Sequence, residues 1–233
     1  MRIAVMQPYI FPYIGYFQLI NSVDKFVFYD DVDFIKQGWV NRNNILVNGQ
    51  KFQFTIPVKN ISSNNSIANT QIDWSSKLLK KFIKTLKQSY KKAPYYERTM
   101  EIVEQSFDQK PDTISNLCAN STNLISEFLE LKTKFELSSE KYNQSLGYEK
   151  EERLISICEL NSANIYINPI GGQELYEKEY FRQKNITLYF LKSKGPKYTQ
   201  FGSEFISGLS IIDILMFNEK KQVQSYLTNY DLI

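Results

Sequence analysis

The chain has 233 residues, of which 42% are hydrophobic and 23% are charged. This balance is typical of soluble globular proteins and supplies enough apolar material for a sizeable core. The net charge of +3, from 28 basic and 25 acidic residues, argues against a nucleic-acid-binding protein, because such a protein carries a dominant basic field.

The sequence contains no histidine. This excludes His-based catalytic triads, His general bases and His metal ligands. The two cysteines, Cys118 and Cys158, lie far apart, which predicts buried thiols in a reducing compartment. The first residues lack the features of a signal peptide, and no stretch approaches the roughly 18 apolar residues of a membrane helix. We therefore expect a cytoplasmic protein without membrane insertion.

The start of the chain predicts a parallel pair of strands. Residues 3–6 form an apolar run that ends at Gln7 and Pro8, and residues 26–29 form a second one. Residues 14–20 between them are typical of a short helix. A strand, a helix and a strand in this order predict a βαβ unit.

A hairpin is expected next. Asn48 and Gly49 separate two β-rich runs, residues 45–47 and 52–56, which is a strong signal for a tight turn. The polar residues 60–69 that follow predict a mobile loop.

Residues 74–131 follow a helical pattern, in which apolar side chains recur at helical spacing from Leu78 to Leu86. Asp112 is the expected cap of a later helix. Many lysines share one face of the first helix, which predicts a solvated surface, with an anion-binding face as the alternative. These lysines are Lys77, Lys80, Lys81, Lys84, Lys87, Lys91 and Lys92. We interpret the segment as a helical insertion or cap.

The last third alternates between short apolar runs and helical patterns. Strands are expected at residues 135–137, 165–167 and 186–191, and helices at 151–160, 174–183, 209–217 and 223–227. This alternation predicts a Rossmann-like α/β fold, a largely parallel sheet with helices on both faces. We expect residues 1–233 to form one domain.

Open α/β sheets bind ligands beyond the carboxyl ends of their strands. The first polar cluster at such a position follows the first strand and contains Gln7, Tyr9, Tyr13, Gly15 and Tyr16. Two prolines stiffen this loop, Gly15 permits close backbone approach, and the helix that follows favours anions. The alternative is an aromatic loop that only covers the core.

The second cluster begins with Asp30 and Asp31 at the end of the second predicted strand. Carboxylates there can hold Mg²⁺, position a hydroxyl group or act as a base. Downstream lie Lys36, Trp39, Asn41, Arg42 and Asn43. The arginine suits a phosphate or carboxylate, and the asparagines suit sugar hydroxyls. Alternatively, the two aspartates cap the following turn and the arginine pairs with one of them.

The third cluster, Asn168, Gly171 and Gly172, lies between a predicted strand and a helix. Backbone N–H groups in such a turn can hold a phosphate or carboxylate, although a plain strand-to-helix turn is the alternative. Further on, Ser210 is the expected N-cap of a helix, and Asp213 three residues later resembles the partner in a capping box.

At these residues the chain resembles the WbqC-like family. The matching segments are MQPYIFPYIGYFQLI, VDKFVFYDDVDFIKQGWVNRN, TIPV, NPIGGQELY and LSIIDILMFN. They run from the first residues to the last helices, so the resemblance covers essentially the whole chain. Many members carry a histidine before the first Gln-Pro pair, where this chain has Met6, so no role of that histidine is carried over.

The resemblance implies a role in bacterial surface-polysaccharide biosynthesis, of O-antigen or lipopolysaccharide, because members are often encoded among genes for such glycans. Our first hypothesis is a transferase that moves an acyl or aminoacyl group onto a nucleotide-activated amino sugar. Its candidate catalytic residues are Asp30, Asp31 and Lys36. Its candidate substrate-binding residues are Gln7, Tyr9, Tyr13, Gly15, Tyr16, Trp39, Asn41, Arg42, Asn43, Asn168, Gly171 and Gly172.

Two alternatives stay open. The opening layout is similar to that of HIGH-type nucleotidyltransferases, with Gly15-Tyr16 where those enzymes have Gly-His, so a nucleotidyltransferase-like or adenylate-forming enzyme is the second hypothesis. The third is a non-catalytic partner of a glycosyltransferase that binds a sugar nucleotide. We expect no dedicated metal site under any of the three hypotheses. Mg²⁺ is expected only if the protein uses a nucleotide. A homo-oligomer is possible under each hypothesis.

Overall fold

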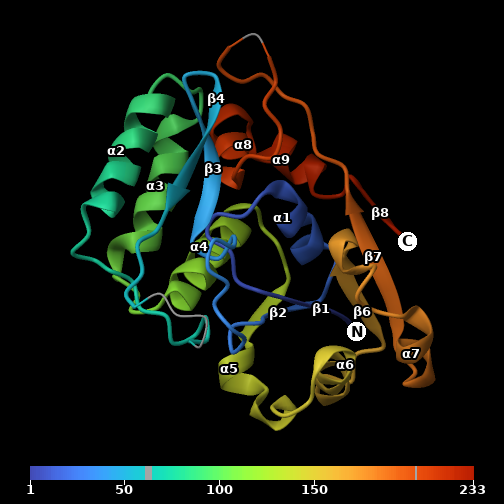
Figure 1. Ribbon diagram of the computed structural model, residues 1–233. Coiled ribbons are helices and arrows are strands. Elements are labelled where there is room, and N and C mark those ends of the chain that lie inside the picture. The colour runs from blue at the N-terminus through green and yellow to red at the C-terminus, as the bar shows by residue number, and fades with distance from the viewer. Residues whose placement is uncertain (61–64, 203) are drawn as a thin grey trace.

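A six-stranded sheet forms the centre of the computed structural model, which describes residues 1–60, 65–202 and 204–233 (Figure 1). The strands lie in the order β5–β2–β1–β6–β7–β8. All neighbours are parallel except β8, which pairs antiparallel with β7. Their bounds are β1 Arg2–Met6, β2 Lys25–Phe28, β5 Lys134–Leu137, β6 Ile165–Pro169, β7 Thr187–Ser193 and β8 Tyr230–Leu232. The predicted Rossmann-like α/β class is confirmed.

The sheet is built outward from its middle in two directions. The chain passes from β1 to β2 and β5 on one side, then returns to β6 beside β1 and continues to β7 on the other. The order therefore reverses between β1 and β6, which makes this boundary the topological switch point of the sheet. The helices between strands are α1 Ile14–Asn21, α6 Lys150–Leu160 and α7 Lys178–Gln183.

Both faces of the sheet are covered, because successive strand residues point to opposite sides. In β1, Ala4 belongs to one apolar cluster, while its neighbours Ile3 and Val5 belong to another. β2 divides in the same way, with Phe26 and Val27 on opposite faces. Such strands carry apolar residues at every position, which explains why the sequence shows short apolar runs without alternation.

The predicted hairpin consists of β3 Arg42–Val47 and β4 Gln50–Thr55, which form a separate two-stranded sheet. Asn48 and Gly49 have φ angles of 50° and 75°, as a two-residue hairpin turn requires. The hairpin packs on the helical segment through Phe54 and Phe82, whose ring centroids lie 4.2 Å apart. The helices there are α2 Lys77–Tyr90, α3 Tyr96–Asp108 and α4 Ile114–Phe128.

Several local predictions need correction. The cap of α4 is Thr113, whose side chain accepts from the Asn116 N–H, and not Asp112. The helix expected at residues 174–183 begins only at Lys178, because 3₁₀-type bonds hold the chain from Ile170 to Leu175. The short elements β8, α5 Ser138–Lys141 and η1 Asn143–Ser145 were not predicted. The predicted loop at residues 60–69 lies partly outside the described residues.

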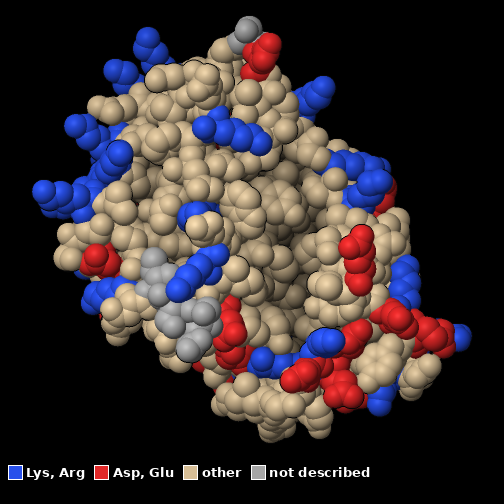
Figure 2. Space-filling model, in the orientation of Figure 1, with Lys and Arg blue, Asp and Glu red and all other residues tan. Residues whose placement is uncertain are grey.

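The remaining surface predictions hold. All seven lysines named above are exposed, so the solvated face of α2 is confirmed, and Figure 2 shows Lys and Arg side chains along that side of the molecule. Cys118 and Cys158 are buried free thiols. Within the described part of the chain, no helix has the length and apolar character needed to cross a membrane.

Asp213 ties distant parts of the fold together. It lies fully buried in α8 Ile211–Phe217, and its carboxylate accepts from the hydroxyls of Tyr90 and Tyr198, each at 2.7 Å, and from Gln200 Nε2 at 2.6 Å. The Tyr90 hydroxyl also accepts from the backbone N–H of Leu46 in β3. The carboxylate thus joins the ends of α2, α8 and the segment that follows β7.

This arrangement corrects the predicted capping box. Ser210 is the N-cap, since its hydroxyl accepts from the Ile212 N–H, but the Ser210 N–H donates to the carbonyl of Asn44 and not to Asp213. Burial raises the pKa of the Asp213 carboxyl above its usual range, more than the three hydrogen bonds lower it.

The raised pKa of Asp213 should appear in the pH dependence of stability when the wild type is compared with Asp213→Asn. Between its ordinary pKa of about 3.9 and its raised pKa, Asp213 binds more protons in the folded state, so its contribution to stability falls as pH rises through that window. The free energy of unfolding of the wild type minus that of Asp213→Asn should therefore decrease with pH. Asn cannot accept all three bonds, so the variant should also lose about 1–3 kcal/mol. Denaturant unfolding over a pH series measures both, and a difference that rises with pH would contradict the assignment.

Candidate functional site

A cavity of about 310 Å³ lies at the topological switch point. Its walls come from the chain beyond β1 and β6, with Tyr29 after β2 and Leu154 from α6. This is where open α/β sheets bind ligands. The face seen in Figure 2 is hollowed near its centre, between the positions of α1 and β6 in Figure 1. We call this space the first cavity.

Tyrosines and amides supply the polar atoms of the first cavity. Its side chains include Gln7, Tyr9, Tyr29, Asn168 and Tyr176, and none of the described residues that line it is charged. Burial raises the pKa of Tyr9, Tyr29 and Tyr176, and for Tyr29 the guanidinium of a nearby arginine offsets part of that rise. The three phenols therefore stay neutral hydrogen-bond donors at physiological pH.

The first loop, residues 7–13, is held by side chains from distant elements. Asn43 Nδ2 donates to the carbonyls of Ile10 and Phe11, and the Ser210 hydroxyl donates to the Phe11 carbonyl at 2.7 Å. Phe11 is buried with a φ of 42°, a left-handed conformation that costs energy for a residue with a side chain. These hydrogen bonds fix the backbone of the loop and thereby the positions of Tyr9 and Tyr13.

Two further cavities adjoin the first. The second cavity, about 250 Å³, is lined by Tyr9, Tyr13, Trp39, Asn43 and others. The third cavity, about 480 Å³, shares Tyr13 and Gly208 with the second. Tyr9 lines both the first and the second cavity. Each cavity therefore shares a lining residue with the next, and we call the three cavities together the groove.

The glycine turn after β6 fits closely around Asn168. The Asn168 side chain accepts from the Tyr166 hydroxyl at 3.0 Å and donates to the Pro169 carbonyl at 3.1 Å. A Cβ atom on Gly172 would lie 1.9 Å from Asn168 Nδ2, whereas one on Gly171 would meet nothing within 4 Å. The absence of a side chain at Gly172 therefore allows the Asn168 amide to take this position.

Asp30 is a structural carboxylate. It is buried beyond β2 and accepts from Ser115 Oγ at 2.7 Å, Ser139 Oγ at 3.0 Å and the Ser139 N–H at 3.0 Å. The Ser138 hydroxyl lies 3.2 Å from Asp30 but 2.6 Å from Asp31, so its single proton favours Asp31. These bonds join β2 to the start of α5 and to α4.

Asp31 pairs with an arginine that the sequence analysis missed. Arg153 of α6 donates through Nη2 to Asp31 at 2.5 Å, and both side chains are largely buried. The guanidinium lies 4.7 Å from the centre of the Tyr29 ring, which lines the first cavity. The pair therefore stands behind the wall of the cavity. No local signal marks Arg153, because it lies within an ordinary amphipathic helix.

The other predicted residues have varied positions. Lys36 is exposed and does not line the groove, and Arg42 donates to the Gly38 carbonyl while Asp31 pairs with Arg153 instead. Asn41 is buried and donates to the Ile56 carbonyl. Trp39 is half exposed at the second cavity.

Two predicted residues at the start of α1, Gly15 and Tyr16, support the packing around the first loop. The hydroxyl of the buried Tyr16 donates to the Gln7 carbonyl at 2.9 Å. A Cβ atom on Gly15 would lie 2.9 Å from Ser193 Oγ, so glycine lets α1 approach β7. The glycine turn does not lead directly into a helix, because η2 Ile170–Gly172 and a further turn precede α7.

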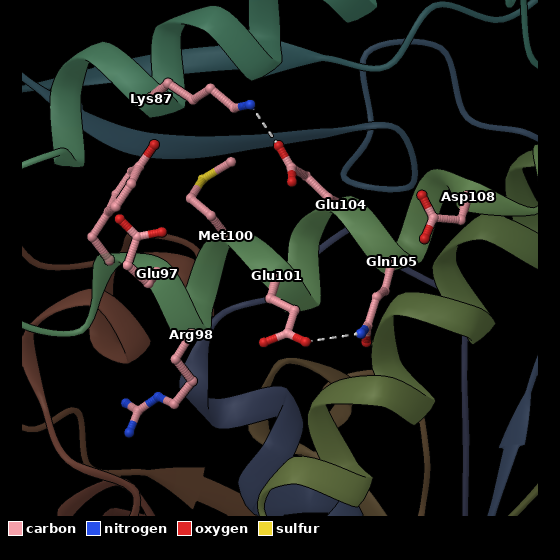
Figure 3. A pocket seen from close by; sticks show the side chains of 9 residues that line it. Lys87, Glu97, Arg98, Met100, Glu101, Glu104, Gln105 and Asp108 are labelled. Atoms are coloured by element: carbon pink, nitrogen blue, oxygen red, sulfur yellow. Dashed lines mark hydrogen bonds and ion pairs between the residues drawn. The ribbon is translucent and has the colours of Figure 1, made fainter.

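A larger hollow of about 640 Å³ lies between α2 and α3, away from the ends of the sheet strands (Figure 3). Two of its charged side chains pair, Lys87 with Glu104 at 2.7 Å, and the amide of Gln105 donates to Glu101. Arg98 points away and donates to the carbonyl of Asn218. This hollow is an open, self-paired helix surface, so we place the candidate site in the groove.

The comparisons with known proteins identify the family of the chain. A model of the WbqC-like protein family matches residues 7–225, which include the first loop, the two aspartates and the glycine turn. The chain belongs to this family. A relative of this WbqC-like chain is the uncharacterized protein Rv1507c of Mycobacterium tuberculosis, 26% identical over 229 residues that cover 97% of each chain. No solved structure matches the present chain.

The two glycines of the turn provide a matched test of the site geometry. Gly172→Ala should lower the free energy of unfolding by about 1–3 kcal/mol, because the added methyl group displaces the Asn168 amide. Gly171→Ala adds the same methyl group where nothing lies within 4 Å, so its effect should stay within about 0.5 kcal/mol. Denaturant unfolding of both variants measures this contrast, and equal losses would show that the turn does not have the described geometry.

Proposed function

We propose that this WbqC-like chain is a transferase of bacterial surface-polysaccharide biosynthesis that acts on a nucleotide-activated amino sugar. The observation that carries the proposal is the first cavity at the switch point, lined by tyrosines and amides without a charged side chain. Its volume of about 310 Å³ is at the lower end of the size range of small-molecule sites.

The lining suits a base or a sugar ring. Tyrosine rings stack on planar or apolar faces, and their hydroxyls donate to sugar oxygens. The Asn168 amide is already held by Tyr166 and Pro169, so it needs no ordering when a ligand binds. Gln7 adds a second amide from the end of β1.

The reaction proposed is acyl or aminoacyl transfer from an ester or thioester donor. The sugar amine attacks the carbonyl carbon of the donor, the C–N bond forms, and the C–O or C–S bond to the carrier breaks. The amine loses one proton, which passes to a carboxylate and from there to the leaving alkoxide or thiolate. The carrier of the acyl group thus leaves as a free alcohol or thiol.

Asp31 is the better candidate for that carboxylate. Asp30 already accepts three short hydrogen bonds, whereas Asp31 accepts from Ser138 and Arg153 and retains lone pairs for a further donor. Its partner Arg153 stacks on Tyr29 at the wall of the first cavity.

One observation favours a second candidate function, a non-catalytic partner of a glycosyltransferase that binds a sugar nucleotide. Asp30, Asp31 and Lys36 do not line the described cavities of the groove. A protein that only binds needs the tyrosines and amides but no acid–base group at the ligand. It would bind nucleotide sugars saturably without turnover.

The test is Asp31→Asn with nucleotide-linked amino sugars and acyl donors, with product read by mass spectrometry. We expect kcat to fall about 100-fold or more, because a general base contributes that much, while sugar-nucleotide binding changes little. Asp33→Asn, on the exposed part of the same loop, is the control and should retain activity. Wild-type turnover in Asp31→Asn would exclude this role.

Two measurements keep this test interpretable. Since Asp31 pairs with the buried Arg153, unfolding of each variant is compared first, and Asp31→Glu replaces Asn if the fold is weakened. A thermal-shift screen with nucleotide sugars detects binding alone, because a ligand at about 100 times its Kd stabilises by roughly 2.7 kcal/mol. Saturable binding without turnover would support the binding partner, and pyrophosphate release from ATP or CTP would support a nucleotidyltransferase.

A further inference from the structure

The third cavity, unlike the first, has a charged side chain among the described residues of its lining, that of Lys197. Its walls are largely apolar, and its volume is about 480 Å³. The apolar lining side chains are Ile14, Pro196, Phe205, Ile206, Leu209 and Ile214. Such a space can hold an aliphatic group, because burial of apolar surface favours binding.

The walls of the third cavity are fixed by hydrogen bonds. The segment after β7 is held by Tyr198, whose hydroxyl donates to the buried Asp213 at 2.7 Å. Within it, Gln200 donates to the Ile206 carbonyl and accepts from the Ile206 N–H at 2.8 Å. The cavity is therefore shaped before any ligand arrives, which lowers the cost of binding.

Lysines stand at the mouth of the third cavity. Lys197 lines it and is exposed. Lys51 reaches across from β4, so that its Nζ lies 3.3 Å from the position that a Cβ atom on Gly208 would occupy. Gly208 belongs to both the second and the third cavity. A ligand that enters this mouth thus meets positive charge before it meets apolar walls.

The third cavity is also linked to the first through shared lining residues. Tyr13 and Gly208 join it to the second cavity, and Tyr9 joins the second to the first. A group bound across Tyr13 can therefore face a molecule held at the switch point. Two substrates, one in the first cavity and one in the third, would then meet in the second cavity between them.

We infer that the third cavity binds the donor substrate, an activated acyl ester or thioester on a phosphate-bearing carrier. Its apolar acyl chain occupies the cavity, and the phosphates of the carrier contact Lys51 and Lys197. This inference rests on the proposed transferase function and adds the class of donor and its binding site.

The experiment measures binding of free coenzyme A and its acetyl, butanoyl and hexanoyl thioesters to the full chain by calorimetry. Affinity should rise about threefold to fourfold for each added methylene group. Ser207→Trp places a ring in the mouth of the cavity and should weaken hexanoyl thioester binding at least tenfold. Thr199→Trp, which is exposed on the same segment but does not line the cavity, is the matched control.

The charge of the mouth is tested separately. Lys51→Glu combined with Lys197→Glu should weaken every thioester at least tenfold and remove much of the salt dependence of binding. Lys192→Glu, exposed and outside the cavity lining, should leave binding unchanged. Equal losses in the control variants, or no dependence on chain length, would overturn the assignment.

Binding of nucleotide sugars is measured on the same variants, so that the two proposals fail separately. If nucleotide sugars bind but no thioester does, the donor site is wrong while the transferase proposal stands. If thioesters bind and Ser207→Trp abolishes this but no nucleotide sugar binds, the donor site stands and the amino-sugar substrate is wrong. Wild-type thioester affinity in Ser207→Trp would overturn the third cavity as the donor site.

Discussion

Hydrogen bonds to the carbonyls of Ile10 and Phe11 set the path of the first loop, and the groove depends on that path. The donors are Asn43, on the hairpin, and Ser210, 199 residues away at the start of α8. They hold Phe11 in a left-handed conformation, which local preference opposes. Tyr9 and Tyr13 belong to this loop and line all three cavities between them, so loosening any of these three bonds would change the groove.

Three buried or largely buried carboxylates differ in how many hydrogen bonds they accept. Burial of a charge is costly unless hydrogen bonds compensate for it, and Asp30 and Asp213 each accept three or more of them. Asp213 fixes the segment over the third cavity, and Asp30 fixes the start of α5. Asp31 pairs with Arg153, whose guanidinium lies over the Tyr29 ring at the wall of the first cavity.

The first and third cavities differ in that, among the described residues, a charged side chain lines only the third. At the switch point, neutral phenols and amides present hydrogen bonds without fixed charge, which suits a sugar or a base. Beyond Tyr13, apolar walls end at lysines, which suits an acyl group on an anionic carrier. The match to the WbqC-like family spans residues 7–225, so the lining of the third cavity, and that of the first apart from Val5 and Met6, lies within the part of the chain that the family shares.

The sequence by itself determined the βαβ start, the hairpin at Asn48-Gly49 and the α/β class, because apolar runs and turn residues report backbone conformation locally. It also marked the first loop and the glycine turn as parts of a site. Tertiary structure decided the pairing of β1 with β6, which creates the switch point, and the partners of the aspartates. Arg153 lies 122 residues from Asp31, and Tyr90 lies 123 from Asp213. Such partners depend on how the whole chain packs, and no local pattern encodes them.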